Sequence, residues 1–272
     1  MASGRSTRTP PGRGSQRGKN PVAGARKRTT SAGRAAPKNR QVPWLLIGSL
    51  VVILALVGGI GFFLFDRQSQ VSPWRPSEDN RDPSLAIPGI ATAAYEGQHH
   101  VLPEQRVAYD RLPPYGGPHD GYWAACNGQV YAQPVRNENM VHSLEHGAVW
   151  IAYDPARVSG AALDTLTAKV SGQNQMMISP YPGLDQPISL QSWGHQLKLT
   201  DPTDPRLDQF VTSLKGNPYG VFPEVGASCD ALGPGAFDPA DPPRFDPSPY
   251  APGTLPMDYQ GTSGAGATGG AG

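Results

Sequence analysis

The stretch WLLIGSLVVILALVGGIGFFL, residues 44–64, contains no charged side chain and divides the chain into two unlike parts. About twenty apolar residues are what a helix needs to cross the hydrocarbon core of a bilayer. The residues before this stretch include eleven Lys and Arg residues and no acidic residue. Because basic segments beside a span tend to stay in the cytoplasm, we expect residues 1–42 inside the cell and the C-terminal part outside it.

The alternative to an anchor is a cleaved signal peptide. Its apolar core is shorter, about 7–15 residues, and is followed by a cleavage site of small residues. Here the run ends in GFFLF, residues 61–65, which is too bulky for such a site. We therefore predict a retained transmembrane helix at residues 43–65. The protein is then a single-pass protein of the cell membrane, with the lipid bilayer as one partner and its C-terminal domain extracytoplasmic.

Two segments have compositions typical of disordered chains, the basic arm at residues 1–42 and a Pro- and Gly-rich tail at residues 233–272. For an arm beside a span, contact with anionic lipid is favoured over binding of nucleic acid. Of the 23 basic residues, 12 follow the span, against all 22 acidic residues. An acidic exterior argues against nucleic acid as a partner. A Pro-rich stem, residues 66–88, then leads to a globular domain at residues 89–232.

The globular segment predicts an α+β fold. Asp154-Pro155 and Asp204-Pro205 each place an N-cap and a first-turn proline before apolar residues at helical spacing. Residues 148–153, 176–179, 187–193 and 195–199 have the composition of strands, the last two joined at Gly194. We expect a small, mostly antiparallel sheet with two short helices, preceded by one transmembrane helix and a disordered N-terminal arm.

The chain contains two cysteines, Cys126 and Cys229. Outside the cytoplasm thiols tend to pair, so the first interpretation is a disulfide. The second is that Cys126 is a thiolate ligand of a soft metal ion such as copper. The sequence leaves both interpretations open, because sequence separation does not show whether the two sulfur atoms meet.

Chemically active side chains are densest in VHSLEHG, residues 141–147. His142 and His146 are four residues apart, so on a helix both rings face one way and can share one ion. Upstream, PPYGGPH, residues 113–119, is a stiff turn that ends at His119. These three histidines, with Glu145 beside them, are candidate ligands for copper or zinc. In the alternative interpretation they hold loops in place through hydrogen bonds.

The other histidines receive structural interpretations. His99 and His100 follow the stem, and we expect both to be exposed there. His195 begins a strand, and we expect it on the solvent face of its hairpin.

On these motifs the chain resembles an uncharacterised family of bacterial single-span membrane proteins catalogued as a domain of unknown function. The family pattern is Pro-Pro-x-Ser-Gly-Pro-His, then a segment with glycine and tyrosine, then His-Ser-Leu-Glu-His-Gly. The resemblance covers residues 100–229, with Gly116 in place of the usual serine. It implies a shared domain and a shared topology, and it implies no reaction.

The pattern His-x-x-Glu-His is also the inverted zinc-peptidase motif, in which Glu224 would be the distant third ligand. Against a peptidase, Gly147 and a β-branched, aromatic run follow at once, so a helix here lasts little more than a turn or two. The sequence contains no complete catalytic constellation. It favours a non-enzymatic accessory protein that docks on a membrane-protein complex of the cell envelope. Copper or zinc binding is the second hypothesis, and a zinc peptidase is the third.

Overall fold

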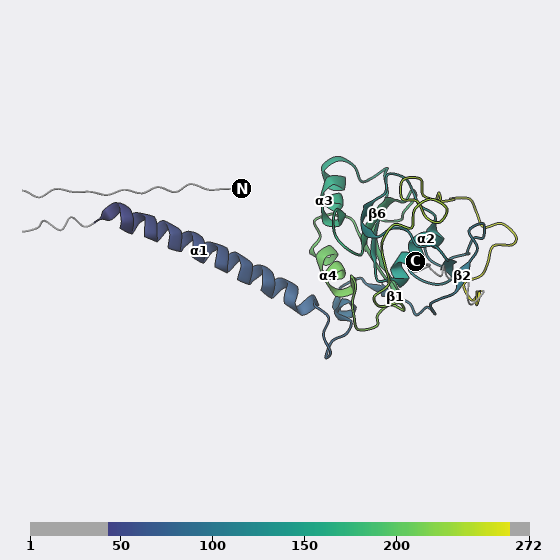
Figure 1. Ribbon diagram of the computed structural model, residues 1–272, viewed down its shortest axis with the longest axis horizontal. Coiled ribbons are helices and arrows are strands. Elements are labelled where there is room, and N and C mark those ends of the chain that lie inside the picture. The colour runs from purple at the N-terminus through teal and green to yellow at the C-terminus, as the bar shows by residue number, and fades with distance from the viewer. Residues whose placement is uncertain (1–42, 262–272) are drawn as a thin grey trace, which may run out of the picture. The chain divides into compact units, whose positions relative to one another are not determined.

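The computed structural model describes residues 43–261. The basic arm, residues 1–42, and the end of the tail, residues 262–272, lie outside the described residues. The disorder expected of these two segments therefore stays a prediction. The described part contains a long apolar helix and a globular α+β domain (Figure 1).

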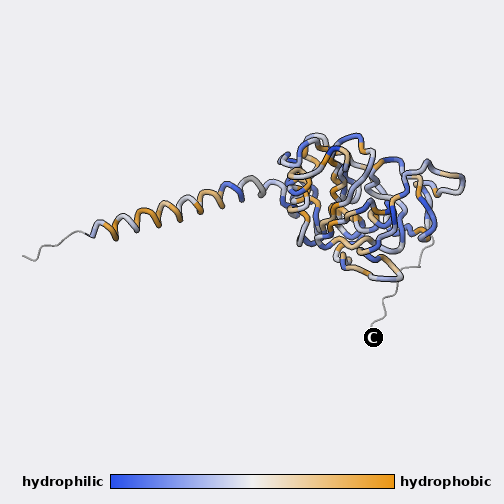
Figure 2. Tube along the Cα trace, turned by 90° about the horizontal axis from the view of Figure 1, so that it is seen from above, coloured by the Kyte–Doolittle hydropathy of each residue, from blue (hydrophilic) through white to orange (hydrophobic). Residues whose placement is uncertain are grey.

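The apolar run forms one continuous helix, α1, Trp44–Val71. Its segment Trp44–Ser69 is the one helix among residues 43–261 that is long and apolar enough to cross a membrane. Residues of high hydropathy follow one another along most of its length (Figure 2). At 1.5 Å per residue, 26 residues extend for about 39 Å, more than the ~30 Å of a hydrocarbon core. By length and composition, α1 could therefore cross a membrane.

The globular domain is built on a six-stranded sheet with the strand order β1-β8-β7-β5-β6-β4. These strands are β1 Ala91–Thr92, β4 Asn127–Val130, β5 Val149–Tyr153, β6 Met176–Pro180, β7 Ile188–Ser192 and β8 His195–Leu199. The central strand β5 runs antiparallel to β7 and parallel to β6. The β7–β8 and β8–β1 pairs are antiparallel, and the β4–β6 pair is parallel. The α+β prediction is confirmed, with a sheet that is mixed rather than purely antiparallel.

The parallel pairing of β5 with β6 has a local cause in α3, Gly160–Val170, which crosses over between these two strands. Parallel neighbours need a connection of about a dozen residues or more, and a helix supplies it. This helix begins later than the sequence predicts, because Asp154 caps a separate turn by accepting a hydrogen bond from the backbone N–H of Ala156. The second predicted helix is α4, Pro205–Leu214, and its N-cap is Asp204 as expected.

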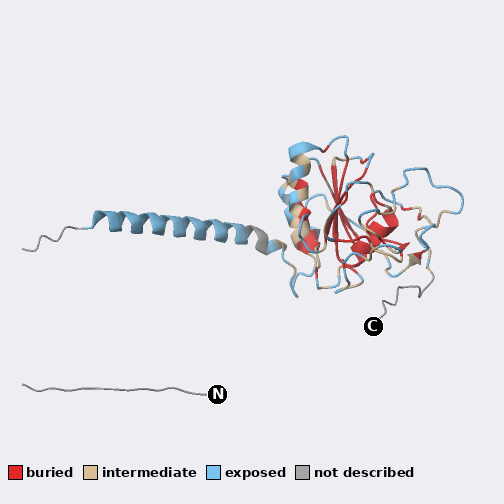
Figure 3. Cartoon of the chain, turned by 45° about the horizontal axis from the view of Figure 1, so that its top comes forward, coloured by how far each residue is buried: buried red, intermediate tan, exposed pale blue. Residues whose placement is uncertain are grey.

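Side chains of β5 alternate between the two faces of the sheet. Val149, Ile151 and Tyr153 belong to the apolar cluster that contains the buried residues of α3 and α4. Trp150 and Ala152 belong to a second cluster, on the face covered by a third helix, α2, Asn137–Glu145. The central strands β5, β6 and β7 are therefore buried on both faces (Figure 3). Helix α2 carries residues 141–145 of the histidine motif, and His146 and Gly147 follow its end.

Segments on both sides of the predicted domain pack onto it. The stem forms two short 3₁₀ helices, η1 Ser72–Trp74 and η2 Pro83–Ala86, and the carbonyl of Trp74 accepts a hydrogen bond from Ser213 on α4. The tail continues along the domain through Gly261, with Phe237 fully buried. Disorder expected from residue 233 is thus not what the structure shows for residues 233–261. Turn-forming residues dominate their composition, but their few apolar side chains pack against the core around α2.

The two cysteines form a disulfide, with Cα atoms 4.8 Å apart. The backbone N–H of Cys126 also donates to the carbonyl of Cys229, at 2.9 Å. The sulfur of Cys126 is therefore engaged and is not a metal ligand. Disulfides persist in oxidising compartments, so this bond is compatible with an extracytoplasmic domain.

Candidate metal centre

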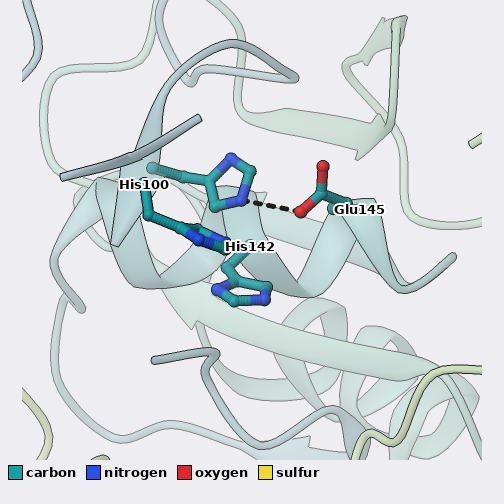
Figure 4. Close-up of side chains that lie close together, drawn as sticks. His100, His142 and Glu145 are labelled. Atoms are coloured by element: carbon teal, nitrogen blue, oxygen red, sulfur yellow. Dashed lines mark ion pairs between the residues drawn. The ribbon is translucent and has the colours of Figure 1, made fainter. Parts of the chain in front are cut away.

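The densest group of histidines lies where α2 meets a small second sheet. His142 and Glu145 occupy successive turns at the C-terminal end of α2. Strands β2, His100–Val101, and β3, His119–Asp120, pair in parallel, with His100 opposite His119. The ring centroids of His119 and His142 are 4.7 Å apart, and His100 is 5.1 Å from each of them. Figure 4 shows His100, His142 and Glu145 gathered in one place, with a dashed line at the ion pair that Glu145 makes.

Helix α2 ends in a way that adds His146 to this group. His146 is the C-cap, and its backbone N–H donates to the carbonyl of His142. Gly147 follows with φ of +86°, and a Cβ there would lie 2.4 Å from the ring of Phe222. Glycine is therefore required where the chain turns from α2 toward β5. The turn leaves the rings of His142 and His146 with centroids 4.6 Å apart.

Three of the histidines are held in one tautomer by backbone carbonyls. In each of them Nδ1 donates to a backbone carbonyl oxygen. The acceptors are Gly117 for His119 (2.9 Å), Asp120 for His142 (2.5 Å) and Ser228 for His146 (2.6 Å). A carbonyl oxygen only accepts, so Nδ1 carries the proton and a neutral ring keeps its lone pair on Nε2. Metal-ligating histidines are typically oriented in this way, with the second ring nitrogen donating to a carbonyl or carboxylate.

The atoms that face one another inside this group lack hydrogen bonds. Nε2 of His100, Nε2 of His119 and Oε2 of Glu145 are buried and have no hydrogen-bond partner within the described part of the chain. Nε2 of His119 and Oε2 of Glu145 are 2.8 Å apart, the spacing of an ion pair if His119 is protonated. Because buried polar atoms are almost always paired, three such atoms at one place make this group a candidate ligand site.

The other oxygen of Glu145 is held by the backbone. Oε1 accepts a hydrogen bond of 2.6 Å from the backbone N–H of Gln98, a residue with φ of +64°. A Cβ at Gly97 would lie 2.5 Å from the same oxygen. Glycine at position 97 thus permits the close approach, and the carboxylate keeps one fixed orientation.

Burial sets the protonation of the group. Burial, and then the neighbouring His119, lowers the pKa of His100. Burial, with His119 and His146 adding to it, lowers the pKa of His142 well below its usual value. Burial alone would raise the pKa of Glu145, but the contacts with His119 and Gln98 lower it overall. The lowered pKa values favour uncharged rings at His100 and His142 and an ionised carboxylate at Glu145, the forms in which these side chains bind metal.

The potential ligands form two sets that share His142. The inner set is His100, His119, His142 and Glu145, and the outer set is His142, His146 and Glu224. Each residue offers one ligand atom, and within a set these atoms lie within 4.8 Å of one another. The sets differ in exposure, because the side chains of His119 and Glu145 are fully buried and that of Glu224 is 29% exposed.

The structure brings together all four ligands named from the sequence, but it divides them between the sets. His119, His142 and Glu145 belong to the inner set, and His146 belongs to the outer set. The prediction that His100 is exposed is wrong, because pairing of β2 with β3 turns it inward. That pairing has no sequence signal, since each strand is two residues long. Glu224, noted only as a peptidase ligand, completes the outer set.

The two remaining histidines lie outside both sets. His99 contacts the carbonyl of Gln260 and the carboxylate of Glu96. His195 is only 8% exposed, and its Nε2 is 2.9 Å from Oδ2 of Asp82. The prediction that His195 faces solvent is wrong, because the stem folds back over β8 and covers it.

Comparison with known proteins finds a family model that matches part of the chain. No curated protein and no solved structure matches the chain. The region that matches a family model, residues 100–231, begins at His100 and contains both ligand sets and the disulfide. Residues 100–231 match the model of a family described as "Protein of unknown function (DUF3105)".

Proposed function

We propose that this protein is a membrane-anchored metal-binding protein whose inner set holds one divalent transition-metal ion, zinc or copper(II). The observation that carries the proposal is the convergence of three buried atoms that lack a hydrogen-bond partner among the described residues, on His100, His119 and Glu145. Pure hydrogen bonding would leave these atoms unpaired, at a cost of about 1–3 kcal/mol each. A bound cation accepts all three lone pairs and offsets the buried negative charge of Glu145.

The donor atoms favour zinc or copper(II) over other ions. Imidazole suits both, whereas magnesium and calcium prefer sites made of oxygen ligands. Copper(I) prefers sulfur, whereas the two ligand sets consist of histidines and glutamates. Zinc–ligand bonds of ~2.0–2.1 Å place tetrahedral ligand atoms about 3.4 Å apart. The ligand atoms of the inner set lie within 4.8 Å of one another, so the ion would draw them inward by at most about 1 Å each.

The inner set supports storage, delivery or a structural role more than hydrolysis. Catalytic zinc keeps an open position for water and has three protein ligands. The inner set offers four, and Glu145 is fully buried with one oxygen held by Gln98. A carboxylate held in this way is poorly placed to activate a water, which is the task of the glutamate in the peptidase motif.

The proposed location is the outer side of the membrane. The length of α1, the basic residues before it and the disulfide support this orientation. A tag fused after Gly272 would test it in spheroplasts treated with protease. The tag should be digested while the membrane is intact. A tag that survives until detergent is added would place the domain in the cytoplasm and contradict the proposal.

Metal analysis of the full chain, purified in detergent, tests the metal proposal. After chelation and titration with zinc, we expect one tightly bound ion per chain. The His119→Ala/His142→Ala variant should lose it, because it removes half of the inner set. His99→Ala is the matched control, since His99 lies beside His100 but outside both sets, and it should keep the ion. A wild-type protein that takes up no stoichiometric zinc or copper would refute the proposal.

A further inference from the structure

We infer that the outer set is an entry station, through which the metal ion passes on its way to the inner set. The inference rests on the proposed function, because it supplies the inner set with a route. It assigns a role to His146 and Glu224, which the four-ligand inner set leaves unused.

The outer set is built as a site. Nε2 of His146 lies 3.2 Å from Oε2 of Glu224, and Nδ1 of His146 is held by the carbonyl of Ser228. The ring of Trp123 packs against His146, with ring centroids 4.9 Å apart. His146 therefore has one orientation, and its free nitrogen points toward a carboxylate at the solvent edge.

The two sets cannot be filled independently. Nδ1 of His142 is engaged by the carbonyl of Asp120, so His142 has one free nitrogen, and that nitrogen binds one ion at a time. An ion held by His142 in the outer set can move inward without leaving this ligand. It exchanges His146 and Glu224 for His100, His119 and Glu145, with no change in its oxidation state.

Exposure and ligand number give the movement a direction. The outer set offers three ligands, and the 29% exposure of Glu224 leaves room for water on the ion. The inner set offers four ligands, of which His119 and Glu145 are fully buried. An ion should exchange quickly at the outer set and be held tightly at the inner one.

The two carboxylates are also joined through the backbone. The N–H of Glu224 donates to the carbonyl of Glu145 at 3.1 Å. Gln98 contacts both carboxylates, through its backbone N–H to Glu145 and its side-chain amide to Glu224. These contacts keep the exposed carboxylate next to the buried one, so the distance between the two sets is fixed by the fold.

Uptake of Co²⁺ by the full chain in detergent tests the inference, because the visible absorption of cobalt reports its coordination. In stopped flow, the wild type should show a phase whose rate depends on Co²⁺ concentration, followed by a slower phase that does not. Glu224→Gln keeps the shape of the side chain and removes its charge. We expect this variant to bind one ion at equilibrium but to take it up about tenfold more slowly, since losing one partner of a metal site costs about 10- to 100-fold in affinity.

Controls separate this inference from the proposed function. Glu96→Gln removes the carboxylate that contacts His99, outside both sets, and should leave uptake unchanged. His119→Ala should abolish the slow phase and keep the fast one. Glu224→Gln with wild-type uptake would overturn the entry station and leave the inner set standing. A wild type that binds Co²⁺ with His119→Ala indistinguishable from it would overturn the inner set itself.

Discussion

Substituting Glu145 by glutamine should change stability in opposite directions with and without metal. In the variant, the amide oxygen can still accept from Gln98, at the 2.6 Å of the present bond. The amide nitrogen replaces Oε2, 2.8 Å from Nε2 of His119, and can donate to the lone pair there. Without metal the variant therefore gains one hydrogen bond and loses a buried charge. We expect its free energy of unfolding to equal that of the wild type or exceed it by about 1 kcal/mol.

With metal the order should reverse. A ligand at 1,000 times its dissociation constant stabilises the folded state by about 4 kcal/mol. For a domain of about 150–250 residues this raises Tm by about 8–16 °C. If glutamine weakens binding about 100-fold, the same metal concentration stabilises the variant by only about 1.4 kcal/mol, or about 3–6 °C. Thermal denaturation of both proteins, with chelator and with zinc, measures all four values.

A different result would refute this reasoning. If Glu145 serves only as the partner of a protonated His119, the substitution breaks a buried ion pair and costs about 3–5 kcal/mol. The variant would then melt about 6–20 °C below the wild type in chelator, and zinc would stabilise neither protein.

Three further predictions follow from the geometry. Gly147→Ala should destabilise the domain by about 1–3 kcal/mol and weaken zinc binding, because position 147 combines a positive φ with a clash against Phe222. The control Gly172→Ala has a positive φ but open space around it, and it should cost only about 1 kcal/mol. Thermal denaturation measures both values. Loss of the disulfide in Cys126→Ser/Cys229→Ser should cost up to about 4.7 kcal/mol in the chain-entropy model, because the bond closes a loop with a sequence separation of 103, and an unchanged Tm would contradict it. In chelator, the free energy of unfolding should fall as pH drops below about 6.5. Burial holds the pKa of His142 below its unfolded value, so the unfolded state binds more protons in that window. Melting curves measured across this pH range should show a smaller loss of stability in His142→Gln than in the wild type.

Local signals predicted the parts of the fold that depend on local physics. Asp204-Pro205 marked the start of α4, and the strand at residues 195–199 matches β8 residue for residue, because caps and alternation act over a few residues. Asp154-Pro155 misplaced the start of α3, since the same cap also closes an isolated turn. The parallel pairing of β5 with β6 was not predicted, because it is decided by how α3 packs and not by the strands themselves.

From the sequence, only the part of the site whose residues are close together along the chain could be predicted. His142, Glu145 and His146 lie on one short segment, so the i, i+4 pattern brought them together correctly. His100 joins the site because β2 pairs with β3, and strands of two residues have no recognisable sequence pattern. Unpaired atoms and the carbonyl partners of the rings are properties of packing, with no counterpart in sequence. The docking function that the sequence favours stays a prediction.

X-ray absorption at the zinc edge of the loaded wild-type protein tests the central claim most directly. Coordination by His100, His119, His142 and Glu145 predicts three imidazole nitrogen atoms and one carboxylate oxygen at about 2.0–2.1 Å. His119→Ala should lower the imidazole count. A shell that contains sulfur, or a spectrum of six oxygen ligands with no imidazole scattering, would contradict the account.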